Sequence, residues 1–218
     1  MTLLRVDASI QGPVSASSAL ADLVLAEFTA ARPDEPVVTR HLGQQPVPAQ
    51  AWALAIGGAF TAEADRTPDQ VEALSLAASV AAELADADAA VLALPLYNFG
   101  VSQHVKAWID LALAGASPGT RLLEGKPVVL VTTRGGAYGP GTPRAGWDHS
   151  TDYLRRILAD VWGADLTVIE REFTLVGVNP ALDEFSEMAG QMKQAAEEDA
   201  AKAGRALAGR YLAPAELS

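Results

Sequence analysis

A hydroxyl-rich loop follows the first apolar segment of the chain. Ser9 ends that segment, and Ser15, Ala16 and Ser17 come after a Gly-Pro turn, directly before a helical pattern. The first N–H groups of a helix have no partner inside it and carry a partial positive charge, so they favour an anion. Serine hydroxyls add donors there without adding charge. The loop suits a phosphate monoester, although an ordinary capped turn would have the same composition.

An aromatic loop follows a later apolar run. Its sequence is Pro95-Leu96-Tyr97-Asn98-Phe99. Two aromatic side chains flank an asparagine at the end of a strand-like segment, where a flat apolar ligand could rest. The alternative is that both rings simply cap the core, which the loop taken alone favours.

A glycine-rich loop ends a third apolar run. It reads Thr133-Arg134-Gly135-Gly136 and continues with further glycine and proline. Paired glycines let backbone amides approach a ligand closely, because no side chain intervenes. Glycines also suit a merely flexible connection, so this loop gains meaning only from its position beside the other two.

Strand-like runs alternate with helical patterns along the chain, which is typical of βαβ units and a parallel sheet. The expected strands cover residues 3–8, 37–42, 89–96, 127–133 and 166–173. The expected helices cover residues 15–31, 68–85, 102–114, 151–162 and 188–211, and residues 43–67 read as irregular with an apolar patch at 51–60. We expect one domain, residues 1–218, with a doubly wound sheet of order 2-1-3-4-5 or a Rossmann-like order. In both orders a ligand belongs at the carboxyl ends of the strands, where all three loops would meet.

Local helix signals refine this pattern. Thr67 is the expected N-cap of the helix at 68–85, with Gln70 at the capping-box position. The spacing of apolar residues predicts the inward faces of two other helices. These faces are Leu20, Leu23, Val24 and Phe28 in the first helix, and Leu154, Ile157, Leu158 and Val161 in the fourth.

Composition excludes several classes of function. Half of the 218 residues are apolar and the formal net charge is −11, which argues against nucleic-acid or anionic-membrane partners. The chain has no cysteine, and its three histidines lack the paired spacing of metal ligands, so we expect no metal. No apolar run approaches the length of a spanning helix, and the N-terminal residues do not resemble a signal peptide. These features predict a cytoplasmic protein.

Taken in order, the loops resemble those of the FMN-dependent NADH-azoreductases, a branch of the flavodoxin-like quinone reductases. The resemblance covers most of the chain. It rests on Pro95 to Phe99 followed by Ser102, Lys106 and Asp110, on Ser9 with Ser15-Ala16-Ser17, on Thr67-Pro68 with Glu72-Ala73-Leu74, and on Thr133 to Gly136. Four matches in the same order are more specific than any one alone.

The resemblance implies a flavodoxin-like three-layer α/β sandwich with a five-stranded parallel sheet of order 2-1-3-4-5. It implies FMN as cofactor, with Ser9, Ser15, Ala16 and Ser17 on the phosphate. Pro95, Leu96, Tyr97, Asn98 and Phe99 would lie beside the isoalloxazine ring, with Asn98 near N5, and Thr133, Arg134, Gly135 and Gly136 would contact the pyrimidine edge. Relatives are homodimers that pass a hydride from NADH or NADPH through FMN to a quinone or azo compound in a ping-pong cycle.

The chain departs from this family on the substrate side. Residues 116–123 contain no aromatic residue where relatives often carry several, and Ala137-Tyr138 replaces an Ile-His or Ile-Tyr pair. We expect Phe60 and Tyr138 to line the substrate pocket, and assign no general acid. Two alternatives remain, a specialised FMN enzyme with another native substrate and a non-enzymatic flavodoxin-type electron carrier.

Overall fold

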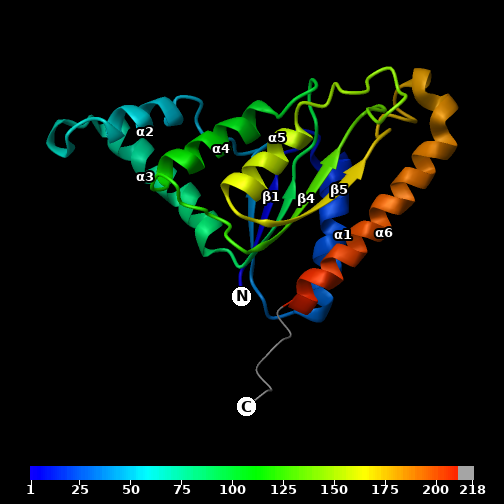
Figure 1. Ribbon diagram of the computed structural model, residues 1–218, viewed down its shortest axis with the longest axis horizontal. Coiled ribbons are helices and arrows are strands. Elements are labelled where there is room, and N and C mark those ends of the chain that lie inside the picture. The colour runs from blue at the N-terminus through cyan, green and yellow to red at the C-terminus, as the bar shows by residue number, and fades with distance from the viewer. Residues whose placement is uncertain (211–218) are drawn as a thin grey trace, which may run out of the picture.

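The computed structural model describes residues 1–210 as a parallel sheet covered by helices on both faces (Figure 1). The strands are β1 (Leu3–Asp7), β2 (Val37–His41), β3 (Ala89–Ala93), β4 (Pro127–Thr133) and β5 (Asp165–Arg171). The helices are α1 (Ala16–Ala31), α2 (Ala51–Ala59), α3 (Pro68–Asp86), α4 (Gln103–Gly115), α5 (Thr151–Arg155) and α6 (Ser186–Arg210). The strand order is β2-β1-β3-β4-β5, so the predicted order 2-1-3-4-5 is confirmed.

The two faces of the sheet carry separate apolar clusters. In β3, Ala89, Val91 and Ala93 pack with α1 and α6, whereas Ala90 and Leu92 pack with the other helices. Successive side chains of a strand point to opposite faces, so a strand buried on both faces must be apolar throughout. This explains why β3 and β4 read as continuous apolar runs in the sequence.

The capping-box prediction for α3 is confirmed. The Thr67 side chain accepts a hydrogen bond from the Gln70 N–H, and the Gln70 side chain accepts one from the Thr67 N–H. Both otherwise unpaired donors at this helix start are thereby satisfied. Residues 186–210 form the long last helix, and Tyr211, its predicted end, lies outside the described residues.

The expectation of irregular structure over residues 51–60 is wrong, because α2 occupies nearly all of this segment. Ala51, Ala55 and Gly58 are its buried residues, spaced three to four apart on one face. A Cβ at Gly58 would lie 3.0 Å from Leu74 Cδ1 and 3.1 Å from Gln70 Cβ. Close packing against α3 therefore stabilises a helix whose glycines weaken its own propensity.

Two predicted inward side chains point elsewhere. Leu23 in α1 is 37% exposed, and Val161 is 39% exposed. Residues Arg156–Val161 form a π-helix, in which the Trp162 N–H donates to the Ile157 carbonyl five residues back. The wider turn places Trp162 fully inside the core, edge-on to Trp108 at 5.7 Å between ring centroids, and leaves Val161 outside.

A hollow at the carboxyl edge of the sheet

A hollow of about 240 Å³ lies where the loops after β1, β3, β4 and β5 meet. Most residues predicted for a ligand site line it: Ser9, Pro95, Leu96, Tyr97, Asn98, Phe99, Thr133, Gly135 and Tyr138. The parallel order of the strands brings these loops together, because their carboxyl ends share one edge of the sheet.

The aromatic loop after β3 is a tight turn with a strained backbone. The N–H groups of Tyr97 and Gly100 each donate to the other residue's carbonyl, at 3.2 and 3.0 Å. Asn98 and Phe99 both have positive φ, 48° and 68°, as a type I′ turn requires. A bulky residue such as phenylalanine adopts this conformation at a cost, and such strain is concentrated at functional sites.

The Tyr97 hydroxyl joins the aromatic loop to the hydroxyl-rich loop. It lies 3.2 Å from Ser9 Oγ and accepts a hydrogen bond from the Ile10 N–H, also at 3.2 Å. Ser9 Oγ in turn accepts from the Gln11 N–H. Polar donors therefore gather at this end of the hollow.

The other residues predicted for phosphate binding surround the start of α1. Ser15 is the N-cap, and its Oγ accepts from the Ser18 N–H at 3.1 Å and lies 3.1 Å from Ser17 Oγ. Ser15 and Ala16 line a second hollow of about 310 Å³, while Ser17 is buried. Thr174 lines both hollows, so the two are adjacent.

Two cations that the sequence interpretation did not single out line this second hollow. They are Arg171, the last residue of β5, and Lys193 of α6. Burial lowers the pKa of Arg171, and the charge of Glu197 opposes that shift. Arg171 Nε is buried without a hydrogen-bond partner in the described chain. An anion at the start of α1 would meet these cations as well as N–H groups and hydroxyls.

The side chain of Arg134 turns away from the first hollow into a cluster of carboxylates. Its Nε donates to Asp148 at 2.6 Å, and its Nη1 lies 2.8 Å from Glu170 and 3.5 Å from Glu172. Burial alone would lower the pKa of Arg134, but the hydrogen bond and charge of Glu170, with those of Asp148, raise it. The guanidinium therefore stays charged and ties the glycine-rich loop to β5.

Asp148 completes this cluster and holds the start of α5. Its Oδ1 accepts from the N–H groups of Ser150 and Thr151, and its Oδ2 accepts from the Thr151 hydroxyl at 2.7 Å. Burial opposes ionisation, but these hydrogen bonds, together with Arg134, outweigh it and lower the pKa of Asp148.

A fourth loop, after β5, also lines the hollow and was not anticipated from the sequence. The N–H groups of Thr174 and Leu175 donate to the carbonyls of Arg134 and Gly135, both at 3.1 Å. A Cβ at Gly135 would lie 2.6 Å from Leu175 Cδ1, so glycine permits this close approach. The rule that identified the other loops, the shared edge of a parallel sheet, applies to this loop equally.

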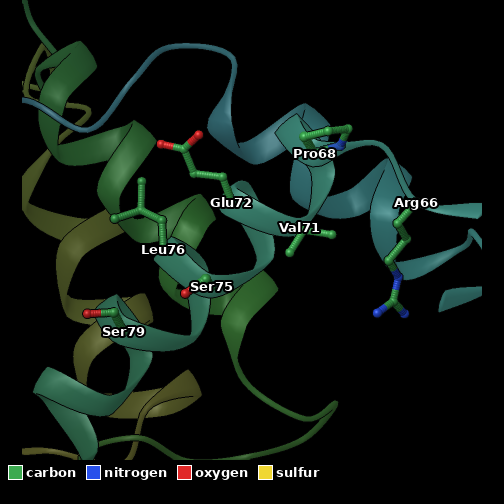
Figure 2. Close-up of a pocket in the computed structure, with 7 residues that line it drawn as sticks. All are labelled: Arg66, Pro68, Val71, Glu72, Ser75, Leu76 and Ser79. Atoms are coloured by element: carbon green, nitrogen blue, oxygen red, sulfur yellow. The ribbon is translucent and has the colours of Figure 1, made fainter. Parts of the chain in front are cut away.

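Besides Arg134 and the residues at the start of α1, two more predicted residues do not line the first hollow. These are Gly136, where a Cβ would lie 3.2 Å from Arg144 Nη1, and Phe60, which caps the C-terminal end of α2 and is 90% exposed. A larger hollow of about 710 Å³ lies on the outer face of α3, away from the sheet edge. Figure 2 shows its lining, including Val71, Glu72 and Leu76. None of the loops that form the first hollow lines it, and most of its residues belong to the surface of α3.

Comparison with known proteins identifies the protein family of this chain. Residues 1–199 match the protein family described as having a flavodoxin-like fold, and the chain belongs to this family. Within residues 1–210, no helix combines the length and apolar character needed to cross a bilayer. In the same range, no three His, Asp or Glu side chains are grouped so that they could hold a metal ion.

Individual relatives show which members of the family the chain is similar to. The chain is 37% identical over 200 residues to an FMN-dependent NADH:quinone oxidoreductase of Frankia alni, covering 89% of this chain and 94% of the relative. It is 36% identical over 216 residues to one of Streptomyces avermitilis, covering 97% and 99%. An azoreductase from Bacillus anthracis str. Sterne has the same fold, with a TM-score of 0.75 at 22% identity over 94% of this chain and 99% of that one. The family resemblance inferred from the loops is confirmed.

Proposed function

We propose that this protein is an FMN-dependent oxidoreductase that passes two electrons from NADH or NADPH to a quinone or azo compound. One observation carries the proposal, the meeting of the serine, aromatic and glycine-rich loops around one hollow in a chain related to FMN-dependent NADH:quinone oxidoreductases. The net reaction with a quinone is NAD(P)H + H⁺ + quinone → NAD(P)⁺ + hydroquinone, which balances in electrons and protons.

The residues present fit FMN. Its phosphate needs donors, and the start of α1 offers the N–H groups of Ala16 and Ser17 and the hydroxyl of Ser15, while the Ser9 hydroxyl lies in the adjacent first hollow. Arg171 and Lys193 border the same place, where Glu197 pairs with Lys193 at 3.7 Å, and together they leave a local positive charge for a phosphate monoester in an acidic protein.

The isoalloxazine ring would lie in the first hollow, between the aromatic and glycine-rich loops. The turn at Asn98 and Phe99 presents backbone at this surface, and Thr133 and Gly135 form the opposite wall. FMN, when bound, supplies the two-electron chemistry, and the protein holds and orients the reactants. Arg134 contributes by fixing the glycine-rich loop through its carboxylate partners rather than by touching the ring.

The proposal includes a homodimer acting in the cytoplasm by a ping-pong order of reactants. Trp52 and Ile56 on α2 are 48% and 37% exposed, whereas Leu54 packs against the core. Trp52, Ile56 and the exposed Phe60 follow one another at intervals of four residues and so share one face of α2, a helix at one far side of the molecule (Figure 1). Exposed apolar surface of this kind marks an interaction site. In a dimer, Phe60 would reach the partner's site, which accounts for its distance from the hollow of its own chain.

The visible spectrum of the protein mixed with FMN tests this proposal. We expect bound flavin whose absorption bleaches within seconds on anaerobic addition of NADH or NADPH and returns on addition of a quinone. Bound flavin that stays oxidised would contradict the reductase and favour a different redox role. Absence of flavin binding would refute the whole assignment.

A further inference from the structure

Arg144, on the loop between β4 and α5, lines the first hollow. Its guanidinium carbon lies 6.0 Å from the centre of the Phe99 ring and 5.8 Å from that of Tyr138. These two rings are 6.4 Å apart, and all three residues line the hollow. Cation–π attraction therefore holds the positive charge beside these two rings, at the hollow.

The loop that carries Arg144 is fixed by hydrogen bonds. The Thr142 hydroxyl donates to the Gly139 carbonyl at 2.8 Å, and the Trp147 N–H donates to the Arg144 carbonyl at 3.0 Å. The His149 N–H donates to the Phe99 carbonyl at 2.9 Å, which joins this loop directly to the aromatic turn. These hydrogen bonds fix the backbone that carries Arg144 beside the aromatic turn.

Arg144 differs from Arg134 in its partners. Arg134 is surrounded by three carboxylates, whereas no ion pair or hydrogen bond engages the Arg144 side chain within the part of the chain that the structure describes. The Nη1 atom of Arg144 lies next to the glycine-rich loop, 3.2 Å from the position that a Cβ on Gly136 would occupy. An acidic protein with net charge −11 therefore presents an uncompensated cation at its proposed site.

We propose that Arg144 makes the site selective for acceptors that carry an anionic substituent, a carboxylate or sulfonate, beside the quinone or azo group. This inference rests on the proposed function. The planar guanidinium can donate two parallel hydrogen bonds to such a group, and charge-assisted hydrogen bonds are stronger than neutral ones. The flanking rings of Phe99 and Tyr138 would cover the aromatic part of the same acceptor.

The test compares ortho-naphthoquinone with its sulfonate as acceptors for the FMN-loaded enzyme, with NADH or NADPH as donor. In Arg144→Gln, we expect the ratio of kcat/KM for the sulfonate to that for the parent quinone to fall about 10- to 100-fold. Arg144→Lys should retain part of the preference, because the charge remains but the planar fork is lost. Arg205→Gln is the matched control, since it removes an exposed arginine of α6 and should leave the ratio unchanged.

A binding measurement gives a readout without turnover. Calorimetry with naphthalene sulfonate, which accepts no electrons from the enzyme, should show a Kd about 10-fold higher for Arg144→Gln than for the wild type. Equal losses for both quinones, with an unchanged Kd, would overturn the inference. A slower reduction of the flavin by NADH or NADPH in Arg144→Gln, with the acceptor ratio unchanged, would also overturn it, by assigning Arg144 to the phosphates of the dinucleotide. If the wild-type flavin is not reduced at all, the proposed function itself fails, and the calorimetric comparison still tests Arg144.

Discussion

Replacing Arg134 with methionine tests how the glycine-rich loop is held in place. Methionine fills a similar volume but leaves Asp148, Glu170 and Glu172 without their shared cation. Arg134 and Asp148 are only 7% and 13% exposed, so water cannot replace the lost interaction fully. Removing one partner of a buried ion pair costs about 3–5 kcal/mol of unfolding free energy, a large share of the roughly 5–15 kcal/mol typical of a domain.

Arg155→Met is the matched control. Arg155 pairs with the same carboxylate, Glu170, at 3.1 Å, but its side chain is 48% exposed. Exposed pairs contribute about 0–1 kcal/mol because water and salt screen them. Urea unfolding followed by tryptophan fluorescence should therefore separate the two variants by at least about 2 kcal/mol at neutral pH. FMN affinity should fall in Arg134→Met and stay near the wild-type value in Arg155→Met.

The pH dependence of the free energy of unfolding provides a second test. The hydrogen bond from Arg134 is one of the interactions that lower the pKa of Asp148, so its stabilising effect is lost as the pH falls below about 4, and the defect of Arg134→Met should shrink there. A loss below about 1 kcal/mol for Arg134→Met at pH 7 would refute the argument that burial makes this pair strong. Equal destabilisation of both variants would refute it as well.

Three further predictions concern the site and the packing around it. Asp148→Asn should lower the free energy of unfolding at pH 7. The pKa of Asp148 is lower in the folded protein than in the unfolded chain, so its carboxylate stabilises the fold only at a pH above the unfolded-state pKa. The difference between variant and wild type in urea unfolding should therefore shrink as the pH falls below about 4. Ser15→Ala should lower the free energy of unfolding by about 1 kcal/mol through loss of the α1 cap, and should weaken FMN binding in a fluorescence titration. Gly204→Ala should destabilise by about 1–3 kcal/mol, because its Cβ would lie 2.8 Å from Glu27 Cβ and closer still to the Val24 carbonyl. Gly209→Ala, with nothing within 4 Å, should stabilise α6 by about 0.5–1 kcal/mol, and opposite shifts in Tm would test this contrast.

The fold is predictable from the sequence where one local rule decides the structure. The strand Pro127–Thr133 is buried at every position, so its apolar run predicted it to the residue. The Thr67 cap needed only side-chain chemistry within three residues. By contrast, α2 is stabilised by packing against α3. Its Gly57-Gly58 pair has a low helix propensity, so local sequence rules do not predict the helix. The π-turn that buries Trp162 instead of Val161 likewise depends on Trp108, a partner far away in the sequence.

The position of the candidate site was predictable from the sheet topology. The three loops that contain Ser9, Tyr97 and Gly135 lie at one edge, as a doubly wound sheet requires. The roles of individual side chains could not be predicted, because they depend on which groups the folded chain brings close. Arg134 belongs to a matching motif, but its side chain binds carboxylates, whereas Arg144 belongs to no motif and faces the hollow.

The distribution of charge adds to what composition predicts. With a net charge of −11, composition favours a phosphate held mainly by backbone N–H groups and hydroxyls. Net charge is a sum over the whole surface, however, and a ligand responds mainly to charges within about 8–10 Å. Arg171 and Lys193 at one hollow, and Arg144 at the other, supply local positive charge that the total conceals. An acidic protein can therefore favour anionic ligands at its site while its remaining surface repels them, which makes the charge of the acceptor a property that one side chain can change.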